Sequence, residues 1–262
     1  MHNWDADDYR KHSEVQLKWG RELINKLTLK DDARVLDIGC GDGKVTAEIA
    51  ASVPRGRVIG IDSSAEMIRV AAESFPRERC ANLEFRLMDA RELRFNEEFD
   101  IVFSNAVLHW IKDHRTVLGG IAACLKHHDR ILLQMGGTGN VRDMLIVMTG
   151  LTVDAKWKQY FIDFESPYSF YSPEEYKVWL KEAKMRPLRV ELIPKDMTQH
   201  GRDGLTAWVR TTWHPFLDRL PDALRQEFLD SAVDNYLLKH PLEADGLAHV
   251  AAVRLEVEAE KI

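Results

Sequence analysis

The chain has 262 residues, enough for one large α/β domain or two small ones. Its net charge of -6 and pI near 5.9 argue against a nucleic-acid platform, which needs a basic field to displace counterions from phosphates. Three scattered cysteines without metal-ligand spacing predict a reduced, cytoplasmic protein with no disulfide and no metal site. We expect neither export nor a membrane span, since there is no signal-like N-terminus and no apolar run of about 18 residues.

Apolar residues at helical spacing between residues 14 and 27 predict an amphipathic helix before the first strand. Strands and helices then alternate along the chain. We expect strands at 34–38, 57–61, 83–87, 99–104 and 130–135, and helices at 44–52, 65–74 and 114–126. Such alternation favours right-handed crossovers, which give a parallel sheet with helices on both faces and a ligand site beyond the carboxyl ends of the strands.

The alternation stops after Gly137. Residues 141–185 are helix-rich and aromatic, which indicates either a packing layer or the lining of a substrate cavity. Strands six and seven are expected at 188–192 and 248–257, with a helical segment at 205–239 between them.

The stretch Val35–Lys44 reads as a strand, a tight turn and a helix start. Glycines at 39, 41 and 43 allow positive φ and leave no Cβ in the way, so a ligand can lie on the turn. A dinucleotide-binding turn has a different glycine spacing and no flanking anions, whereas here Asp37 and Asp42 flank the loop. Carboxylates suit a cationic ligand. S-adenosylmethionine, with its ammonium and sulfonium centres, is the common adenosine ligand of that kind.

Two more strand ends carry a carboxylate. Asp62 ends the second strand, where it would reach the two ribose hydroxyls of a nucleoside, although it could also cap the helix that starts near Ser64. Asp89 follows the third strand and is placed to accept a hydrogen bond from an adenine amino group. The order and spacing of the three signals favour a cofactor site over three unrelated turns.

With these residues in this order, the chain resembles the Rossmann-type (class I) S-adenosylmethionine-dependent methyltransferases, clearly over about residues 30–140. The resemblance implies a doubly wound, mostly parallel seven-stranded sheet with helices on both faces and a helical lid. We expect a single domain whose core spans about 30–140, 186–195 and 246–258, with the lid at about 1–29, 141–185 and 196–245. The implied cofactor-binding residues are Tyr9, Asp37, Gly39, Cys40, Gly41, Asp62, Ser63, Met67, Asp89, Ala90 and Asn105.

The segment from Ser104 to His114 is similar to small-molecule carboxyl methyltransferases, namely the trans-aconitate and juvenile hormone acid methyltransferase families. It lacks the Asn-Pro-Pro-Tyr sequence common in enzymes that methylate amino nitrogens. In the juvenile hormone acid methyltransferase family a Gln of the opening helix and the Trp after strand four hold the substrate carboxylate, and the matching residues here are Gln16 and Trp110. The departure from the family pattern at 126–129 is expected to alter only a surface turn, whereas the departure at 136–140 lies on the active face and leaves the identity of the substrate open.

Four more residues are candidates for the acceptor side. His109 is either a general base or a hydrogen-bonding ring that shapes the pocket wall beside Trp110. Arg142, Arg202 and Arg210 are candidate carboxylate anchors, with Arg142 and Arg210 preferred, although most arginines are merely solvated.

We therefore expect methyl transfer from S-adenosylmethionine to a small-molecule acceptor, with carboxyl O-methylation as the first hypothesis. One alternative is N- or O-methylation of a small amine or hydroxyl compound. Another is a methyltransferase-like binding module without catalysis. We expect no nucleic-acid partner, and either a monomer or a homodimer.

Overall fold

The computed structural model describes the backbone of residues 14–262 and the side chains from residue 17 onward. This part of the chain divides into two compact units. The sheet unit comprises residues 14–138, 168–193 and 254–262, and the helical unit comprises residues 139–167 and 194–253. Each unit is described by itself below.

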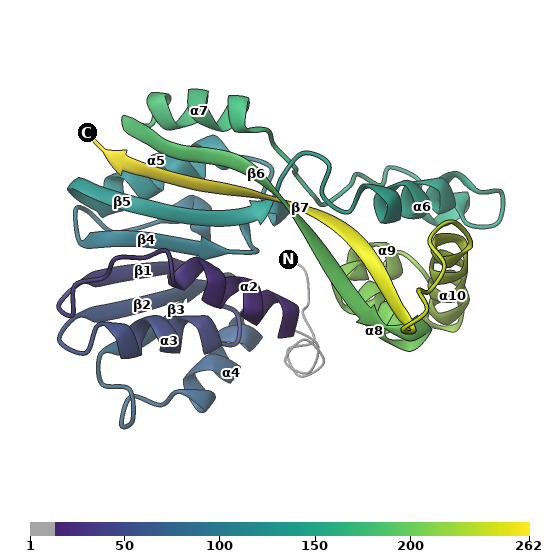
Figure 1. The fold of residues 1–262 in the computed structure, drawn as a ribbon, viewed down its shortest axis with the longest axis horizontal. Coiled ribbons are helices and arrows are strands. Elements are labelled where there is room, and N and C mark those ends of the chain that lie inside the picture. Colours follow the sequence, from purple (N-terminus) through teal and green to yellow (C-terminus); the bar gives the residue numbers. More distant parts are fainter. Residues whose placement is uncertain (1–13) are drawn as a thin grey trace. The chain divides into compact units, whose positions relative to one another are not determined.

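The sheet has seven strands in the order β3-β2-β1-β4-β5-β7-β6 (Figure 1). The strands are β1 Arg34–Ile38, β2 Arg57–Asp62, β3 Leu83–Leu87, β4 Phe99–Asn105, β5 Leu125–Gly136, β6 Met185–His200 and β7 Leu247–Lys261. β1 to β5 pair in parallel, and β7 is antiparallel to β5. The predicted mostly parallel, seven-stranded sheet is confirmed. β6 and β7 are longer than predicted, and residues 194–200 and 247–253 of these strands belong to the helical unit.

Helices cover both faces of the sheet, and each face has its own core. Leu23 of α2 (Glu14–Ile24) and Ile49 of α3 (Lys44–Ser52) pack on one face; α4 (Ala65–Ser74) packs on β2 and β3. Val117 of α5 (His114–Cys124) and Leu180 of α7 (Pro173–Glu182) pack on the other. Strand order reverses between β1 and β4, so the crevice beyond their carboxyl ends is where a ligand of a doubly wound sheet binds.

Aromatic side chains form the core of the helical unit. Its helices are α6 (Arg142–Val153), η3 (Lys158–Tyr160), α8 (Gly201–Thr212), α9 (His214–Leu217) and α10 (Asp222–Lys239). The ring of Trp157 meets Phe228 edge-on at 5.3 Å, and Phe161 and Phe164 both pack against Phe216. These aromatic residues of the 141–185 segment therefore serve packing.

Three boundaries differ from the sequence predictions. The helix predicted to reach residue 126 ends at Cys124, because Leu125 already pairs with Phe99 and residues 126–129 bulge out of the ladder. The helical segment predicted at 205–239 consists of three helices and begins earlier, at Gly201. Residues 168–185, predicted as part of a lid, belong to the sheet unit because Tyr176 and Leu180 are buried in its core.

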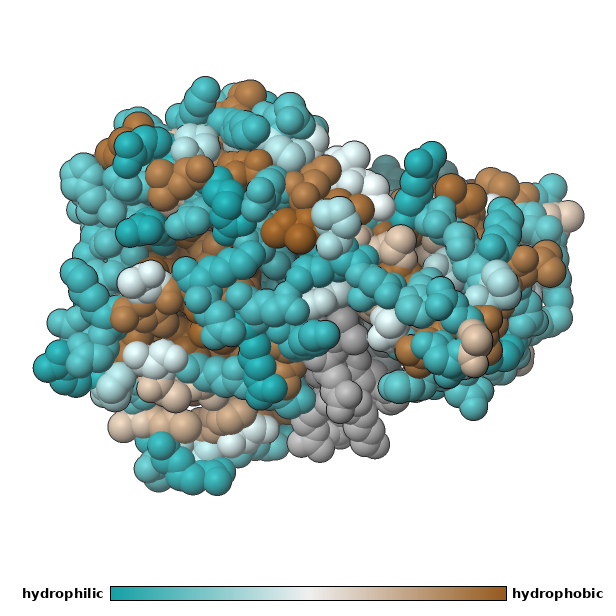
Figure 2. Space-filling model, in the orientation of Figure 1, coloured by the Kyte–Doolittle hydropathy of each residue, from teal (hydrophilic) through white to brown (hydrophobic). Residues whose placement is uncertain are grey.

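The surface is mixed in polarity. Figure 2 shows a face on which hydrophilic side chains surround scattered hydrophobic ones. Among the described residues, no helix has the length and apolar character needed to cross a membrane.

A buried histidine fixes the turn that follows β4. The His114 ring, at the start of α5, donates from Nε2 to the carbonyl oxygen of Leu108 at 2.7 Å, and its Nδ1 is bonded to the Tyr176 hydroxyl. The contact with Leu108 ties down η2 (Leu108–Trp110). Burial lowers the pKa of His114 to about 4, so the ring is neutral at physiological pH.

This shift predicts an acid-sensitive contribution to stability. The unfolded chain accepts a proton on His114 below about pH 6.5, whereas the folded chain resists it down to about pH 4, so stability falls between those values. Between pH 7 and pH 5 the loss from this residue is about 2 kcal/mol, at 1.36 kcal/mol per pKa unit.

Urea unfolding at the two pH values tests it. His114→Gln should be less stable at pH 7 but lose about 2 kcal/mol less than wild type on going to pH 5. The exposed His127→Gln is the matched control. Equal pH dependence in wild type and His114→Gln would contradict the assignment.

Candidate functional site

Three left-handed glycines shape the turn between β1 and α3. Gly39, Gly41 and Gly43 have φ values of 74°, 52° and 82°. A Cβ on Gly39 would lie 2.1 Å from Val107 Cγ2, so the turn closes tightly against the loop after β4. Among the described residues, a Cβ on Gly41 would meet nothing within 4 Å. The middle of the turn thus offers bare backbone to open space, as a ligand needs.

Asp62 joins the turn to the end of β2. Its Oδ2 accepts the N–H of Gly41 at 3.1 Å, and its Oδ1 accepts the N–H of Ser64 at 2.8 Å. The side chain of Ser64, rather than Asp62, caps α4 by accepting the N–H of Met67. Burial raises the pKa of Asp62. A third backbone N–H, that of Ser63, also acts on this carboxylate, and all three lower its pKa against the effect of burial. A carboxylate offers about four acceptor positions, so Asp62 can still accept a hydrogen bond from a ligand hydroxyl.

Asp37 lies beneath the same turn and is 2% exposed. Its Oδ2 accepts the Thr46 hydroxyl at 2.6 Å. Burial raises the pKa of Asp37 to about 7, against the opposing effect of the Thr46 hydrogen bond, and the nearby Asp62 raises it further. The second flanking acid, Asp42, forms an ion pair with Lys44 at 2.8 Å. Asp37 and Asp62 are therefore the two carboxylates whose buried charge a cationic ligand would relieve.

The remaining predicted cofactor residues lie at strand ends or close by. Asp89 follows β3 and is bound by the Arg91 guanidinium at 2.6 Å, which holds the pKa of Asp89 below its usual value. Cys40 is buried against Gly60, where an added Cβ would lie 2.9 Å from its Cβ. Met67 and Ala90 are buried, Ser63 is exposed, and Asn105 is half-buried at the end of β4.

The turn after β4 carries a wall of rings. The ring of Trp110 is 4.9 Å from that of Tyr168 and 5.6 Å from that of His109. Phe170 stacks on Tyr168 at 5.7 Å. Nδ1 of His109 accepts the N–H of Gly136 at 3.3 Å, so this nitrogen carries no proton. Burial lowers the pKa of His109 well below its usual value, and the positive charge of Arg254 lowers it further.

The other predicted acceptor-side residues are less defined. Gln16 lies in α2, but its side chain is outside the described residues, as is all of Tyr9. Arg142 and Arg210 are exposed residues of the helical unit, and their role as anchors stays a prediction. Arg202 is engaged by two carboxylates, Asp230 at 3.1 Å and Asp234 at 2.8 Å, and is therefore a poor anchor.

Sequence reasoning missed Arg254, which is 5% exposed in β7. Its guanidinium lies 5.3 Å from the ring centre of Trp19 in α2, and its partner in the sheet ladder is Gly136. A signal was present in the sequence: Arg254 and Glu256 interrupt the otherwise apolar run 250–257 of this strand. Buried charges of this kind are rare unless they bind a partner.

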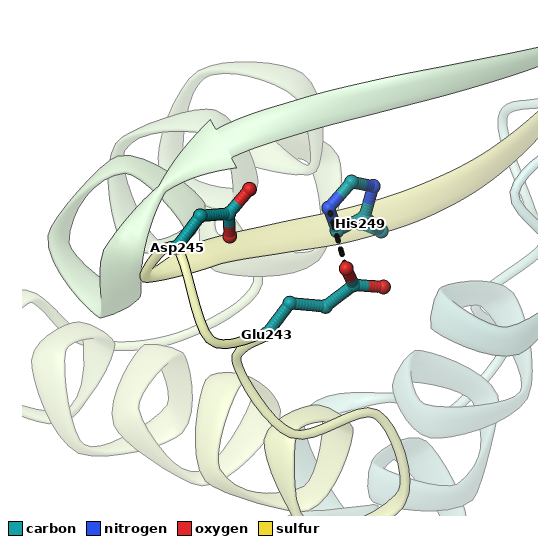
Figure 3. Close-up of side chains that lie close together, drawn as sticks. All are labelled: Glu243, Asp245 and His249. Atoms are coloured by element: carbon teal, nitrogen blue, oxygen red, sulfur yellow. Dashed lines mark ion pairs between the residues drawn. The ribbon is translucent and has the colours of Figure 1, made fainter.

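One group in the helical unit has the geometry of metal ligands. Oxygen and nitrogen atoms of Glu243, Asp245 and His249 lie within 4.8 Å of one another (Figure 3). Both carboxylates are exposed, and Nδ1 of His249 bonds Asp196 at 2.6 Å, which raises the pKa of His249. The contacts of His249 with Asp196 and Glu243 account for this group as an ion-pair cluster.

Residues 35–128 match the family model described as a methyltransferase domain. The chain is 32% identical to an uncharacterised methyltransferase of Schizosaccharomyces pombe over 98% of both chains. It is 29% identical to a trans-aconitate 2-methyltransferase of Rhodopseudomonas palustris over the full length of both.

Solved structures agree in fold. Phosphoethanolamine N-methyltransferase 2 of Haemonchus contortus, in complex with S-adenosyl-L-methionine, is 22% identical with a TM-score of 0.62, over 98% of this chain and 56% of that one. The YcgJ protein of Bacillus subtilis is 18% identical with a TM-score of 0.62, over 94% and 98% of the two chains.

The raised pKa of Asp37 predicts a trade-off between stability and ligand binding. Folding lifts this pKa from about 3.9 to about 7, so the stability present at low pH is lost as the pH rises through 7. Asp37→Asn removes the buried charge. Relative to wild type it should gain about 3 kcal/mol in unfolding free energy between pH 4.5 and pH 8.

The same substitution should weaken the binding of S-adenosylhomocysteine at least tenfold, because the ligand's ammonium loses its counter-charge. Urea unfolding and calorimetric titration measure the two effects. The exposed Asp31→Asn serves as the matched control. A variant with wild-type pH dependence and wild-type affinity would show that the buried charge of Asp37 does not destabilise the fold and that Asp37 does not contribute to ligand binding.

Proposed function

The chain belongs to the class I S-adenosylmethionine-dependent methyltransferases related to the trans-aconitate 2-methyltransferases, and from this premise we propose that it methylates a carboxylate oxygen of a small-molecule acid. Its trans-aconitate methyltransferase relatives support a carboxylate acceptor. The protonation state and hydrogen bonding of His109 favour a carboxylate acceptor over a hydroxyl or an amine.

The residues at the turn fit the cofactor. Asp62 would accept hydrogen bonds from the ribose hydroxyls, and the open backbone at Gly41 leaves room for the ligand. Asp37 would face the cationic amino-acid part, and Asp89 the adenine amino group. S-adenosylmethionine supplies an electrophilic methyl group on a cationic sulfur.

His109 is poorly suited to be a general base. Such a base needs a free lone pair and a pKa near the working pH. The Nδ1 lone pair of His109 already accepts the N–H of Gly136, and burial keeps its pKa well below the usual value. A hydroxyl or ammonium acceptor would have to lose a proton to such a group. A carboxylate is ionised at neutral pH and needs none.

The protein then acts by positioning. Trp110, with Tyr168 and Phe170 beside it, forms a ring wall that excludes water, and the neutral His109 presents its Nε2–H as a donor. Gln16, on the opening helix, would hold the acceptor together with Trp110. Attack requires an oxygen about 3 to 3.5 Å from the methyl carbon and in line with the breaking bond, and exclusion of water strengthens the attraction between the opposite charges.

The pH profile of turnover tests the proposal. With labelled S-adenosylmethionine and a panel of acids, amines and phenols, wild type should methylate an acid, at a rate nearly constant between about pH 6.5 and 8.5. His109→Gln, which keeps a polar side chain, should retain a substantial fraction of turnover. Trp110→Ala and Gln16→Ala should lose at least tenfold, because each removes a positioning contact.

The opposite result would favour a hydroxyl or an amine as the acceptor. If the rate climbs through the histidine pKa range and His109→Gln is inactive at every pH, the acceptor is a hydroxyl or an amine and His109 is its base. Affinity for S-adenosylhomocysteine, measured on each variant, separates loss of chemistry from loss of the cofactor site.

A further inference from the structure

The turn that carries His109 and Trp110 is held by a side chain from outside it. This turn, η2, is a 3₁₀ helix of three residues, and such helices have poor hydrogen-bond geometry. Its first carbonyl oxygen, that of Leu108, accepts the N–H of Ile111 at 2.8 Å and the Nε2–H of His114 at 2.7 Å. Both lone pairs of this oxygen are therefore used, and the second bond comes from α5.

The bond to Leu108 fixes the backbone on which His109 is carried. The carbonyl of Leu108 and the N–H of His109 belong to one planar peptide unit. The next peptide unit, which leads to Trp110, is held as well, because the carbonyl oxygen of His109 accepts the N–H of Ser169 at 2.8 Å. The His109 ring accepts the N–H of Gly136. His109 is thus held by the peptide plane before it, by the plane after it and at its ring.

His114 is in turn oriented by Tyr176. The two residues are 2% and 0% exposed, and Nδ1 of His114 is bonded to the Tyr176 hydroxyl. The Leu108 carbonyl can only accept, so Nε2 carries the proton; in the neutral ring Nδ1 carries none and accepts from Tyr176. The same hydroxyl lies 2.9 Å from Sδ of Met135 in β5. Without this hydroxyl the ring would be free to take the other tautomer, which turns a lone pair toward the Leu108 carbonyl.

We propose that His114 and Tyr176 are positioning residues for methyl transfer. Acting through the Leu108 carbonyl, they hold the two side chains that place the acceptor, His109 and Trp110. This rests on the proposed function, which assigns those two side chains to the acceptor side. Transfer is sensitive to small displacements of the reacting atoms, so loss of this support should lower kcat and change the acceptor's KM little.

Substitutions that mimic one ring nitrogen at a time test the role of His114. The amide nitrogen of Gln reaches about as far as Nε2 of His, and that of Asn about as far as Nδ1. His114→Gln can keep the bond to Leu108 and should retain about a third or more of the wild-type kcat. His114→Asn and His114→Phe lose that bond and should fall about tenfold or more in kcat, with KM within about threefold. Their affinity for S-adenosylhomocysteine should stay within about twofold.

A double-mutant cycle tests the link to Tyr176. Tyr176→Phe should lower kcat about threefold or more in the wild-type chain but less than about twofold in His114→Phe, because its effect passes through the His114 ring. Turnover is measured at neutral pH with labelled S-adenosylmethionine. The acceptor is whichever of trans-aconitate, cinnamate, dodecanoate and tyramine the wild type methylates fastest. The control, Ile121→Val, shortens a buried side chain of α5 without removing these hydrogen bonds and should keep kcat within about twofold.

Several outcomes would overturn the proposal: wild-type kcat in His114→Asn and His114→Phe, an equal loss in His114→Gln, or additive effects in the cycle. A parallel loss of affinity for S-adenosylhomocysteine would do so too, because it would show general structural support. If His114→Phe does not fold, the comparison of Gln with Asn decides. If tyramine is the compound methylated and the kcat pattern holds, carboxyl methylation fails while the roles of His114 and Tyr176 stand. If an acid is methylated equally fast by every variant, the reverse is true.

Discussion

The hydrogen bond from the Gly41 N–H to the Asp62 carboxylate is the contact on which the site depends. It joins the turn after β1 to the end of β2, and it exists because three glycines adopt left-handed backbone that other residues rarely take. The N–H groups of Gly39 and Cys40 both reach the carbonyl oxygen of Ile61, which fixes the turn against the same strand. These contacts hold a carboxylate where a nucleoside would lie, although burial of its charge costs free energy.

The acceptor side is organised by buried charges and rings instead of backbone. Gly20 brings α2 so close to the sheet that an added Cβ would lie 2.8 Å from Val45 and 3.1 Å from Asn105. Trp19 and Lys26, before and after it, contact Arg254 and Glu256 of β7. The opening helix is therefore tied to the last strand by a cation–aromatic contact, and the turn after this helix is tied to the same strand by an ion pair. The role proposed for Gln16 requires such an attachment, because positioning catalysis tolerates little movement of the helix that carries the residue.

Local pattern predicted the elements well because strands β1 to β4 and the helices between them carry their own signals: apolar runs, glycine turns and caps such as Ser64. Long-range effects were not predictable. The end of α5 depends on the pairing of Leu125 with Phe99, and the assignment of α7 to the sheet unit depends on buried Tyr176. At the site, the left-handed glycines and Asp62 follow from spacing, whereas Arg254 is brought to His109 only by the antiparallel return of β7. The ion pairs of Asp42 and Asp89 could not be predicted from the sequence either.

The central claim is that this turn and Asp62 form the nucleoside site, and a calorimetric titration of S-adenosylhomocysteine tests it most directly. Wild type should bind it and should not bind NAD. Asp62→Ala should bind at least tenfold more weakly, since charge-assisted hydrogen bonds are each worth about 1.5 to 3 kcal/mol, while the exposed Asp31→Ala should match wild type. Unchanged affinity in a folded Asp62→Ala variant, or tight binding of NAD by wild type, would contradict the account.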